Sequence, residues 1–194
     1  MGARNLIGIN FCVFICGFLI YLTVDQFELL NFFGLHYFLS DASLPFQPIT
    51  YMFVHGGFFH LALNMFALYV FGIPLEKLWG TKRFLLYYFV CGIGASLFYY
   101  LIYHSRTTDF PTMVGASGAI FGILTAFAMM FPDEKISVYF LFPIKAKYFV
   151  LMYGAIELFS GLANVSGDIT AHYTHLGGMA TGFIFLKVSS LLRE

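Results

Sequence analysis

The sequence predicts an all-α membrane protein in which a bundle of six helices crosses a lipid bilayer. Of the 194 residues, 60% are hydrophobic and only 10% are charged, which is far from the composition of soluble domains. A bilayer core about 30 Å thick needs roughly 20 apolar residues per helix, and six stretches meet this need. The predicted spans are residues 6–24, 58–75, 84–103, 113–131, 148–165 and 171–192. They take up most of the chain, so we expect one membrane domain over residues 1–194.

The basic residues predict the orientation of these spans. Cytoplasmic loops of membrane proteins carry an excess of Lys and Arg. In a six-span chain nine of the ten basic residues fall on one side, and Arg106 alone falls on the other. We therefore expect both termini in the cytoplasm. The first apolar run is too long for a cleaved signal peptide, and short loops without a transit peptide favour a bacterial inner membrane.

The charge distribution argues against a nucleic-acid-binding protein, and the cysteines argue against a metal or cofactor site. The formal net charge is zero and the Lys and Arg residues form no long run, which argues against a nucleic-acid partner. The three cysteines all lie in apolar stretches and have no CxxC spacing. We interpret them as small hydrophobic packing residues and expect neither a cofactor nor a metal.

The first connection on the outer side, residues 25–57, is unusually long and hydrophobic for a linker. Irregular backbone with unpaired N–H and C=O groups is not stable against lipid. We therefore expect short amphipathic segments that lie in the membrane interface, so that this first loop is partly embedded.

Four polar residues in the predicted spans point to a site. Polar side chains in a membrane are costly, so each one suggests a function. His60 and Asn64 are four residues apart on one face of the second span. Ser117 lies near the outer end of the fourth span, and His175 lies near the outer end of the sixth. Because these three spans all run inward from the outer surface, the four side chains are expected at a similar depth.

Glycine pairs provide a way for the serine and the histidine to meet. Gly118 and Gly122 form one GxxxG face and Gly178 and Gly182 form another, and such faces let two helix backbones pack closely in lipid. A serine hydroxyl needs a base to become a nucleophile, and a neutral imidazole is suited to that task.

The developing oxyanion of such a reaction needs hydrogen-bond donors. His60, Asn64 and the backbone N–H of Ser117 are placed to donate, the last because it opens a helix.

The sequence offers no acidic residue that is well placed to complete a catalytic triad. Asp168 falls in an outer loop, and Glu157 lies within the fifth span. We interpret Glu157 either as a protonated carboxyl bonded to a neighbouring helix or as part of a proton path. A serine–histidine dyad is therefore the simpler hypothesis, with Phe121 stacking on the imidazole of His175 from one turn below the serine.

These residues resemble the signature of the rhomboid intramembrane serine proteases. The resemblance covers nearly the whole chain and includes the long first loop. It rests on His55-x4-His60-x3-Asn64 before and in the second span, Gly115-Ala116-Ser117-Gly118 in the fourth, and Thr174-His175-Leu176-Gly177-Gly178 in the sixth.

The resemblance implies an endopeptidase that cleaves transmembrane segments near the extracytoplasmic face. It implies Ser117 as nucleophile, His175 as general base, and His60, Asn64 and the backbone from Gly115 to Ser117 around the oxyanion. His55 borders the site or ends the loop. The implied substrates are single-span membrane proteins that enter past the fifth helix, with residues 166–170 as a movable cap.

The chain departs from the common rhomboid pattern at two places. Phe121 stands where the aromatic residue that packs on the histidine is often a tyrosine. Phe46-Gln47-Pro48 stands where many members carry a Trp-Arg pair that pins the first loop. Glu76 matches a position that ties loops or helices together, which is a structural role.

Three other functions remain as alternatives. A zinc protease requires a ligand set such as HExxH, and HxxxxH does not put both imidazoles on one face. A haem or metal carrier using His60, His172 and His175 leaves Ser117 unexplained. The nearest alternative is an inactive rhomboid relative that binds helices without cutting them. The sequence indicates neither the natural substrate nor the oligomeric state.

Overall fold

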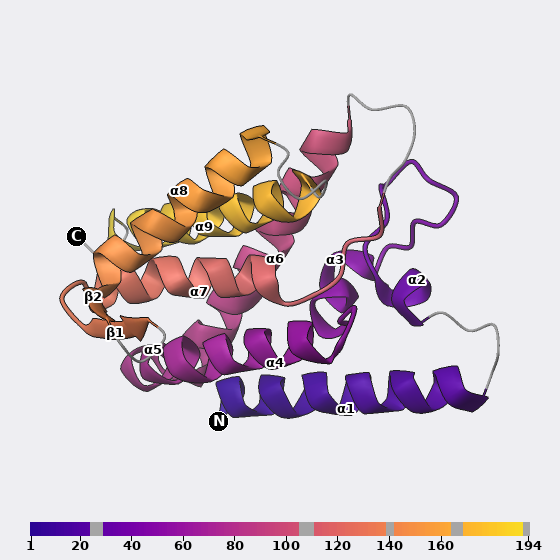
Figure 1. Ribbon diagram of the computed structural model, residues 1–194, viewed down its shortest axis with the longest axis horizontal. Coiled ribbons are helices and arrows are strands. Elements are labelled where there is room, and N and C mark those ends of the chain that lie inside the picture. Colours follow the sequence, from indigo (N-terminus) through magenta and orange to yellow (C-terminus); the bar gives the residue numbers. More distant parts are fainter. Residues whose placement is uncertain (24–28, 105–110, 139–141, 164–168, 192–194) are drawn as a thin grey trace.

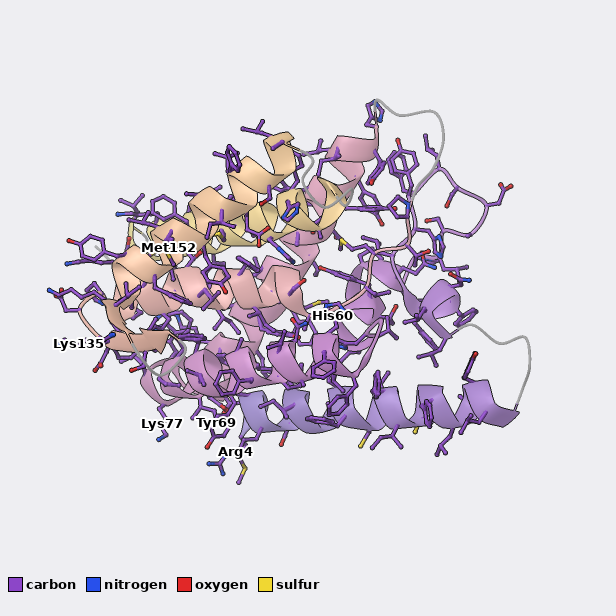
Figure 2. The ribbon with its side chains drawn as sticks, in the orientation of Figure 1. Arg4, His60, Tyr69, Lys77, Lys135 and Met152 are labelled. Atoms are coloured by element: carbon purple, nitrogen blue, oxygen red, sulfur yellow. The ribbon has the colours of Figure 1, made fainter. Side chains whose placement is uncertain are left out.

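The computed structural model describes residues 1–23, 29–104, 111–138, 142–163 and 169–191 and shows a helical bundle (Figure 1). Helices α1, α4, α7 and α9 run along the long axis of the molecule. Both termini and a small β-hairpin lie at one end of the bundle, and the first loop lies at the other. Arg4, Lys77 and Lys135 lie towards the end with the termini, whereas His60 lies away from them (Figure 2).

Each predicted span falls on a helix in the described ranges, and most helix ends shift by a few residues. The long helices are α1 (Gly2–Thr23), α4 (Phe58–Ala67) with α5 (Ile73–Trp79), α6 (Thr81–Tyr103), α7 (Ser117–Met130), α8 (Ala146–Ala163) and α9 (Ile169–Leu191). Three of them have the length and hydropathy of a membrane span, namely Gly2–Leu22, Phe58–Trp79 and Thr81–Tyr103. The chain is therefore a polytopic helical membrane protein.

The second span is interrupted by a π-helical turn, η2 (Leu68–Gly72), between α4 and α5. Pro74 explains the interruption because its ring lacks an N–H and clashes with the carbonyl four residues earlier in a regular α-helix. A wider π turn accommodates both defects while the rod stays continuous. Nothing in the apolar pattern of the span predicts this turn.

The expectation that a helix begins at Met113 is wrong, because α7 begins at Ser117. Residues before it run in extended conformation, and Met113 exchanges two backbone hydrogen bonds with Leu35 of the first loop at 2.8 and 2.9 Å. Gly115 then turns the chain with a φ of 110°, a value that favours glycine. The first loop thus fixes the point at which α7 can start.

The first loop contains the short helical segments that were expected, which are α2 (Leu29–Phe33), α3 (Gln47–Thr50) and the 3-10 turn η1 (Tyr51–Phe53). Its central residue is Gln47, which is fully buried. The amide of Gln47 donates to the carbonyls of Phe32 at 3.2 Å and Ala42 at 3.1 Å. Its oxygen accepts from the N–H groups of His36 at 3.3 Å and Leu44 at 3.1 Å. A single side chain therefore pins the loop in place of a Trp-Arg pair.

The connection between α7 and α8 adds a small β-hairpin to the otherwise helical fold, which the sequence did not predict. Strands β1 (Lys135–Val138) and β2 (Phe142–Lys145) pair antiparallel. Asp133 accepts hydrogen bonds from Lys145 and Lys147, each at 2.9 Å, at the base of this hairpin. These ion pairs are exposed and add little stability.

Three helices, α6, α7 and α9, pack through glycines with almost no space between them. A methyl group on Gly178 of α9 would collide with the carbonyl of Gly118 on α7. One turn further along, a Cβ on Gly182 would lie 3.2 Å from Cα of Gly122. The predicted contact between the two GxxxG faces is confirmed. Helix α6 also packs closely against α9, because Gly94 lies directly on Thr181 of α9.

The contact at Gly178 predicts that even one added methyl group destabilises the bundle. We expect Gly178→Ala to lower the free energy of unfolding by about 1–3 kcal/mol, the usual cost of overpacking. Thermal unfolding in detergent measures the change. Gly8→Ala in α1 is the matched control because a Cβ there meets nothing within 4 Å. Equal stability of the two variants would show that the α7–α9 contact tolerates extra volume.

The hydrogen bonds of Gln47 predict that this side chain holds the loop closed. Gln47→Leu leaves buried polar groups unpaired at a cost of about 1–3 kcal/mol. Amide hydrogen exchange of residues 32–44 should then be at least about fivefold faster. Gln47→Glu keeps the acceptor and loses the two donors, so its exchange should lie between wild type and Gln47→Leu. Unchanged exchange in Gln47→Leu would mean that other contacts fix the loop.

Candidate active site

Ser117 and His175 lie within hydrogen-bond distance of each other. Ser117 is the first residue of α7, and His175 lies in the second turn of α9. Oγ of the serine and Nε2 of the histidine are 2.8 Å apart. The close approach of the two helices at Gly118 and Gly178 makes this distance possible, because each glycine is within three residues of its polar partner.

The ring of Phe121 stacks on the imidazole of His175, as expected from its position one turn below Ser117. The ring centroids are 4.2 Å apart and the planes are inclined by only 11°. Phe121 itself is buried. The phenyl ring thus supports one face of the imidazole and limits its rotation without using a hydroxyl group.

The serine and the histidine line a cavity of about 280 Å³ at the end of the bundle that carries the first loop. His60 and Gly115 line the same cavity, which unites four of the predicted site residues. Asn64, Phe121 and His55 are not among its lining residues. The remaining lining residues are Tyr51, Pro111, Thr112, Met113, Val114, Gly118, Ala171 and Thr174.

Gly115 leaves room for the ring of His60 and turns the backbone before α7. Its own N–H is already hydrogen-bonded and is not a free oxyanion donor. This N–H donates to the carbonyl of Tyr51 at 2.9 Å, so this group is not available to donate to an oxyanion, although Gly115 lines the cavity beside Ser117. A Cβ on Gly115 would lie 2.7 Å from both Cε1 and Nε2 of His60. The absence of a side chain therefore lets the His60 ring approach the segment just before Ser117.

Backbone donors remain at the start of α7. Within the described part of the chain, the N–H groups of Ser117 and Gly118 have no hydrogen-bond partner. The first N–H groups of any helix lack an intrahelical acceptor, and the helix dipole adds partial positive charge there. These two groups are suited to bind a negative oxygen next to the serine hydroxyl.

Asn64 and His55 support the site from the second span and the loop before it. The side-chain amide of Asn64 donates to the carbonyl of His60 at 2.8 Å, which leaves its second N–H available. His55 packs edge-on against His60 with ring centroids 5.1 Å apart, and its Nε2 accepts from the N–H of Ala116 at 3.4 Å. Burial, aided by the nearby His60, lowers the pKa of His55 to about 4, which keeps it neutral and able to accept.

Glu157 is the site residue that sequence reasoning missed. Its Oε1 lies 3.2 Å from Nδ1 of His175, and its Oε2 is hydrogen-bonded to Nδ1 of His172 at 2.6 Å. The expectation that no acidic residue is well placed beside the histidine is therefore wrong. Gly154 and Gly161, three before and four after Glu157, were the available signal, because small residues at such spacing mark a close helix contact. Asp168 lies outside the described residues.

Comparison with known proteins identifies the family. A profile of the Rhomboid domain matches residues 45–190, which is most of the chain. The chain belongs to the rhomboid family. It is 33% identical over 135 residues to "Rhomboid protein 1, mitochondrial" of Saccharomyces cerevisiae, and the aligned residues cover 69% of this chain.

Two bacterial relatives are named as proteases. The rhomboid chain is 42% identical over 89 residues to Rhomboid protease AarA of Providencia stuartii, which covers 41% of the chain. It is 33% identical over 135 residues to Rhomboid protease GluP of Bacillus subtilis, which covers 70% of the chain. The matches span only 38% of the yeast protein, 31% of AarA and 24% of GluP. Activity, substrates and partners of this rhomboid are therefore matters for proposal.

The stacking of Phe121 predicts that its ring orients His175. Phe121→Ala should slow the reaction of Ser117 with a serine-directed fluorophosphonate about fivefold, because an aromatic pair contributes about 1 kcal/mol and about 1.36 kcal/mol is a factor of ten. Phe121→Tyr keeps the ring and should react like wild type. Thermal unfolding of both variants separates lost orientation from lost fold. Wild-type reactivity of folded Phe121→Ala would rule out the orienting role.

Proposed function

We propose that this rhomboid is an intramembrane serine endopeptidase that uses a Ser117–His175 dyad. The observation that carries the proposal is the 2.8 Å contact between Oγ and Nε2 inside a cavity of a bundle made of apolar helices. A serine bonded to a neutral imidazole is the arrangement that activates a hydroxyl for attack on a carbonyl. The named proteases among the relatives support the same reaction class.

In the first half of the reaction the enzyme becomes acylated. His175 Nε2 takes the hydroxyl proton as Oγ of Ser117 forms a bond to the carbonyl carbon of the scissile peptide. The carbonyl oxygen becomes an oxyanion that accepts hydrogen bonds from the N–H groups of Ser117 and Gly118, the His60 ring and the free N–H of Asn64. The C–N bond then breaks, and the imidazolium returns its proton to the leaving amine.

In the second half a water molecule replaces the amine. His175 removes a proton from the water as its oxygen attacks the acyl carbon, and the same oxyanion donors hold the second tetrahedral intermediate. Collapse of that intermediate releases the new carboxyl end and returns the proton to Oγ of Ser117. The stacked ring of Phe121 keeps the imidazole in one orientation through both proton transfers.

The length of α7 puts the proposed reaction below the membrane surface. With 14 residues it is roughly 21 Å long, whereas the hydrocarbon core is about 30 Å thick. With Met130 at the cytoplasmic boundary, Ser117 lies roughly 9 Å beneath the outer boundary. The extended segment before Ser117 bridges the remaining depth, where the first loop pairs with it.

We propose six membrane spans with both termini in the cytoplasm of a bacterial cell, which places the cavity on the extracytoplasmic side. The substrates are single-span membrane proteins with a weak helical segment near that face. A regular helix hides its carbonyls in hydrogen bonds, so cleavage requires local unwinding, which small or helix-breaking residues favour. Entry past α8 completes the proposal, and the expected cap at residues 166–170 lies mostly outside the described residues.

Labelling with a fluorophosphonate probe tests the dyad. The purified chain should be labelled at Ser117, whereas labelling should be lost in Ser117→Ala and should be at least about 10³-fold slower in His175→Ala. Ser96→Ala is the matched control, because Ser96 is a buried serine of α6 whose hydroxyl donates to the carbonyl of Ile93 in its own helix. Equal labelling of all four proteins would exclude the dyad and favour an inactive rhomboid.

The same purified protein tests cleavage and the metal alternatives. A fluorogenic peptide with a helix-weakened transmembrane segment, reconstituted with the enzyme, should be cut by wild type and not by Ser117→Ala. A strong chelator should leave this cleavage unchanged. Cleavage that stops on metal removal would contradict the serine mechanism.

A further inference from the structure

We infer that Glu157 is a positioning residue that makes the dyad a three-membered chain of Ser117, His175 and Glu157, with His172 holding the carboxylate. The inference rests on the proposed function and adds a residue on α8 to it. Four polar side chains form a continuous series that begins at the cavity with Ser117 of α7 and passes through His175 of α9 and Glu157 of α8 to His172 of α9. Their contacts are 2.8 Å from Ser117 to His175, 3.2 Å from His175 to Glu157 and 2.6 Å from Glu157 to His172.

One ring face of His175 and its two nitrogens lie next to three different side chains. Nε2 faces the serine, and Phe121 covers one ring face. Nδ1 is fully buried and makes no hydrogen bond of good geometry in the described part of the chain. Glu157 is the acidic side chain within ion-pair distance of it. A buried nitrogen next to a carboxylate requires only a small rotation of either group to form the bond, and catalytic hydrogen bonds often tighten when substrate binds.

The structure of α8 directs Glu157 towards α9. Its side chain is 11% exposed, whereas its neighbours Ile156 and Leu158 are about half exposed at 50% and 48%. Gly154 and Gly161 allow the approach of α9, because a Cβ there would lie 3.1 Å from Met179 and 3.3 Å from Tyr173. The carboxylate therefore lies between two points at which α8 and α9 pack tightly.

On α9, His172 and His175 are three residues apart and share a face. Each offers Nδ1 to one oxygen of the same carboxylate. Contact with His172 fixes the rotamer of Glu157, so the second oxygen stays beside His175. An unpaired carboxylate in a membrane is costly, and the hydrogen bond from His172 and the nearby Nδ1 of His175 stabilise it.

A carboxylate in this place has two effects on the reaction. It favours the tautomer of His175 that carries its proton on Nδ1, which leaves the lone pair of Nε2 for the proton of Ser117. It also stabilises the imidazolium that forms when the serine is deprotonated. In soluble serine proteases with a Ser-His-Asp triad, replacing the Asp by Asn lowers kcat about 10⁴-fold.

The competing explanation is that Glu157 only ties α8 to α9. A tie of this kind affects the passage of a large substrate past α8. It does not affect the intrinsic reactivity of Ser117 towards a small probe. The labelling rate of a small fluorophosphonate therefore separates the two roles, because the probe does not require a transmembrane helix to enter.

The experiment compares labelling rates and cleavage for wild type, Glu157→Gln, Glu157→Asp and His172→Gln. We expect Glu157→Gln to be labelled at least about tenfold more slowly than wild type. Glu157→Asp keeps the charge and should recover part of the rate. The labelling rate of His172→Gln should lie between the rates of these two variants. Glu76→Gln is the matched control: Glu76 is a second buried glutamate, bonded to the N–H groups of Gly2 and Ala3 far from the cavity. It should label at the wild-type rate per folded molecule.

Labelling of Glu157→Gln within twofold of wild type, with cleavage reduced, would overturn the inference in favour of a tie between helices. Nitrogen-15 NMR of histidine-labelled wild type gives a readout that needs no variant at this position. We expect the proton of neutral His175 on Nδ1, and a proton on Nε2 would overturn the inference even if Glu157→Gln does not fold. If wild type is not labelled at all, the proposed function is contradicted instead. The NMR result then still shows whether Glu157 contacts Nδ1 of His175.

Discussion

The contact between the backbones of Gly118 and Gly178 is the constraint on which the site depends. Any side chain at Gly178 would meet the carbonyl of Gly118, so the two helices touch through main-chain atoms. This contact brings Ser117 and His175 within 2.8 Å although they are 58 residues apart. A second contact one turn below, between Gly122 and Gly182, fixes the relative rotation of the helices. Two points of backbone contact determine the geometry more firmly than side-chain packing alone.

The first loop has an equally direct effect on the chemistry, because it determines where α7 begins. Leu35 pairs with Met113, and the carbonyl of Tyr51 accepts from Gly115. These bonds keep the preceding segment extended, so the helix starts at the serine and its first N–H groups stay unpaired. Gln47 holds the loop that provides these partners. The buried amide of Gln47 therefore helps, through the chain, to determine which N–H groups at the start of α7 stay unpaired.

Sequence reasoning found the parts of the site that spacing encodes and missed those that depend on helix rotation. Polar residues at one depth and glycines four apart were sufficient to place Ser117, His175 and Phe121. The position of Glu157 was harder to predict, because most side chains around α8 are apolar and only the spacing of Gly154 and Gly161 indicates which face turns towards α9. The start of α7 was missed for a related reason, since Met113 and Val114 are as apolar as a helix and only pairing with the loop keeps them extended. The β-hairpin follows from local backbone bonds and the π turn from the ring of Pro74, and hydropathy indicates neither.

The structure also separates structural from functional polar residues within the bundle. Asn10 and Thr125 donate to carbonyls four residues earlier, so the donor of each is used inside its own helix. Ser117, His175 and Glu157 instead find their partners on other helices, and such bonds hold only when the helices keep their relative positions. Asn64 belongs partly to each group, because one N–H bonds within α4 and the other is free. Since the helix bond fixes the rotamer of the amide, the second N–H of Asn64 is held in one direction before substrate binds. That preorganisation is what an oxyanion donor requires, as a donor already in place needs no reorganisation at the moment of reaction.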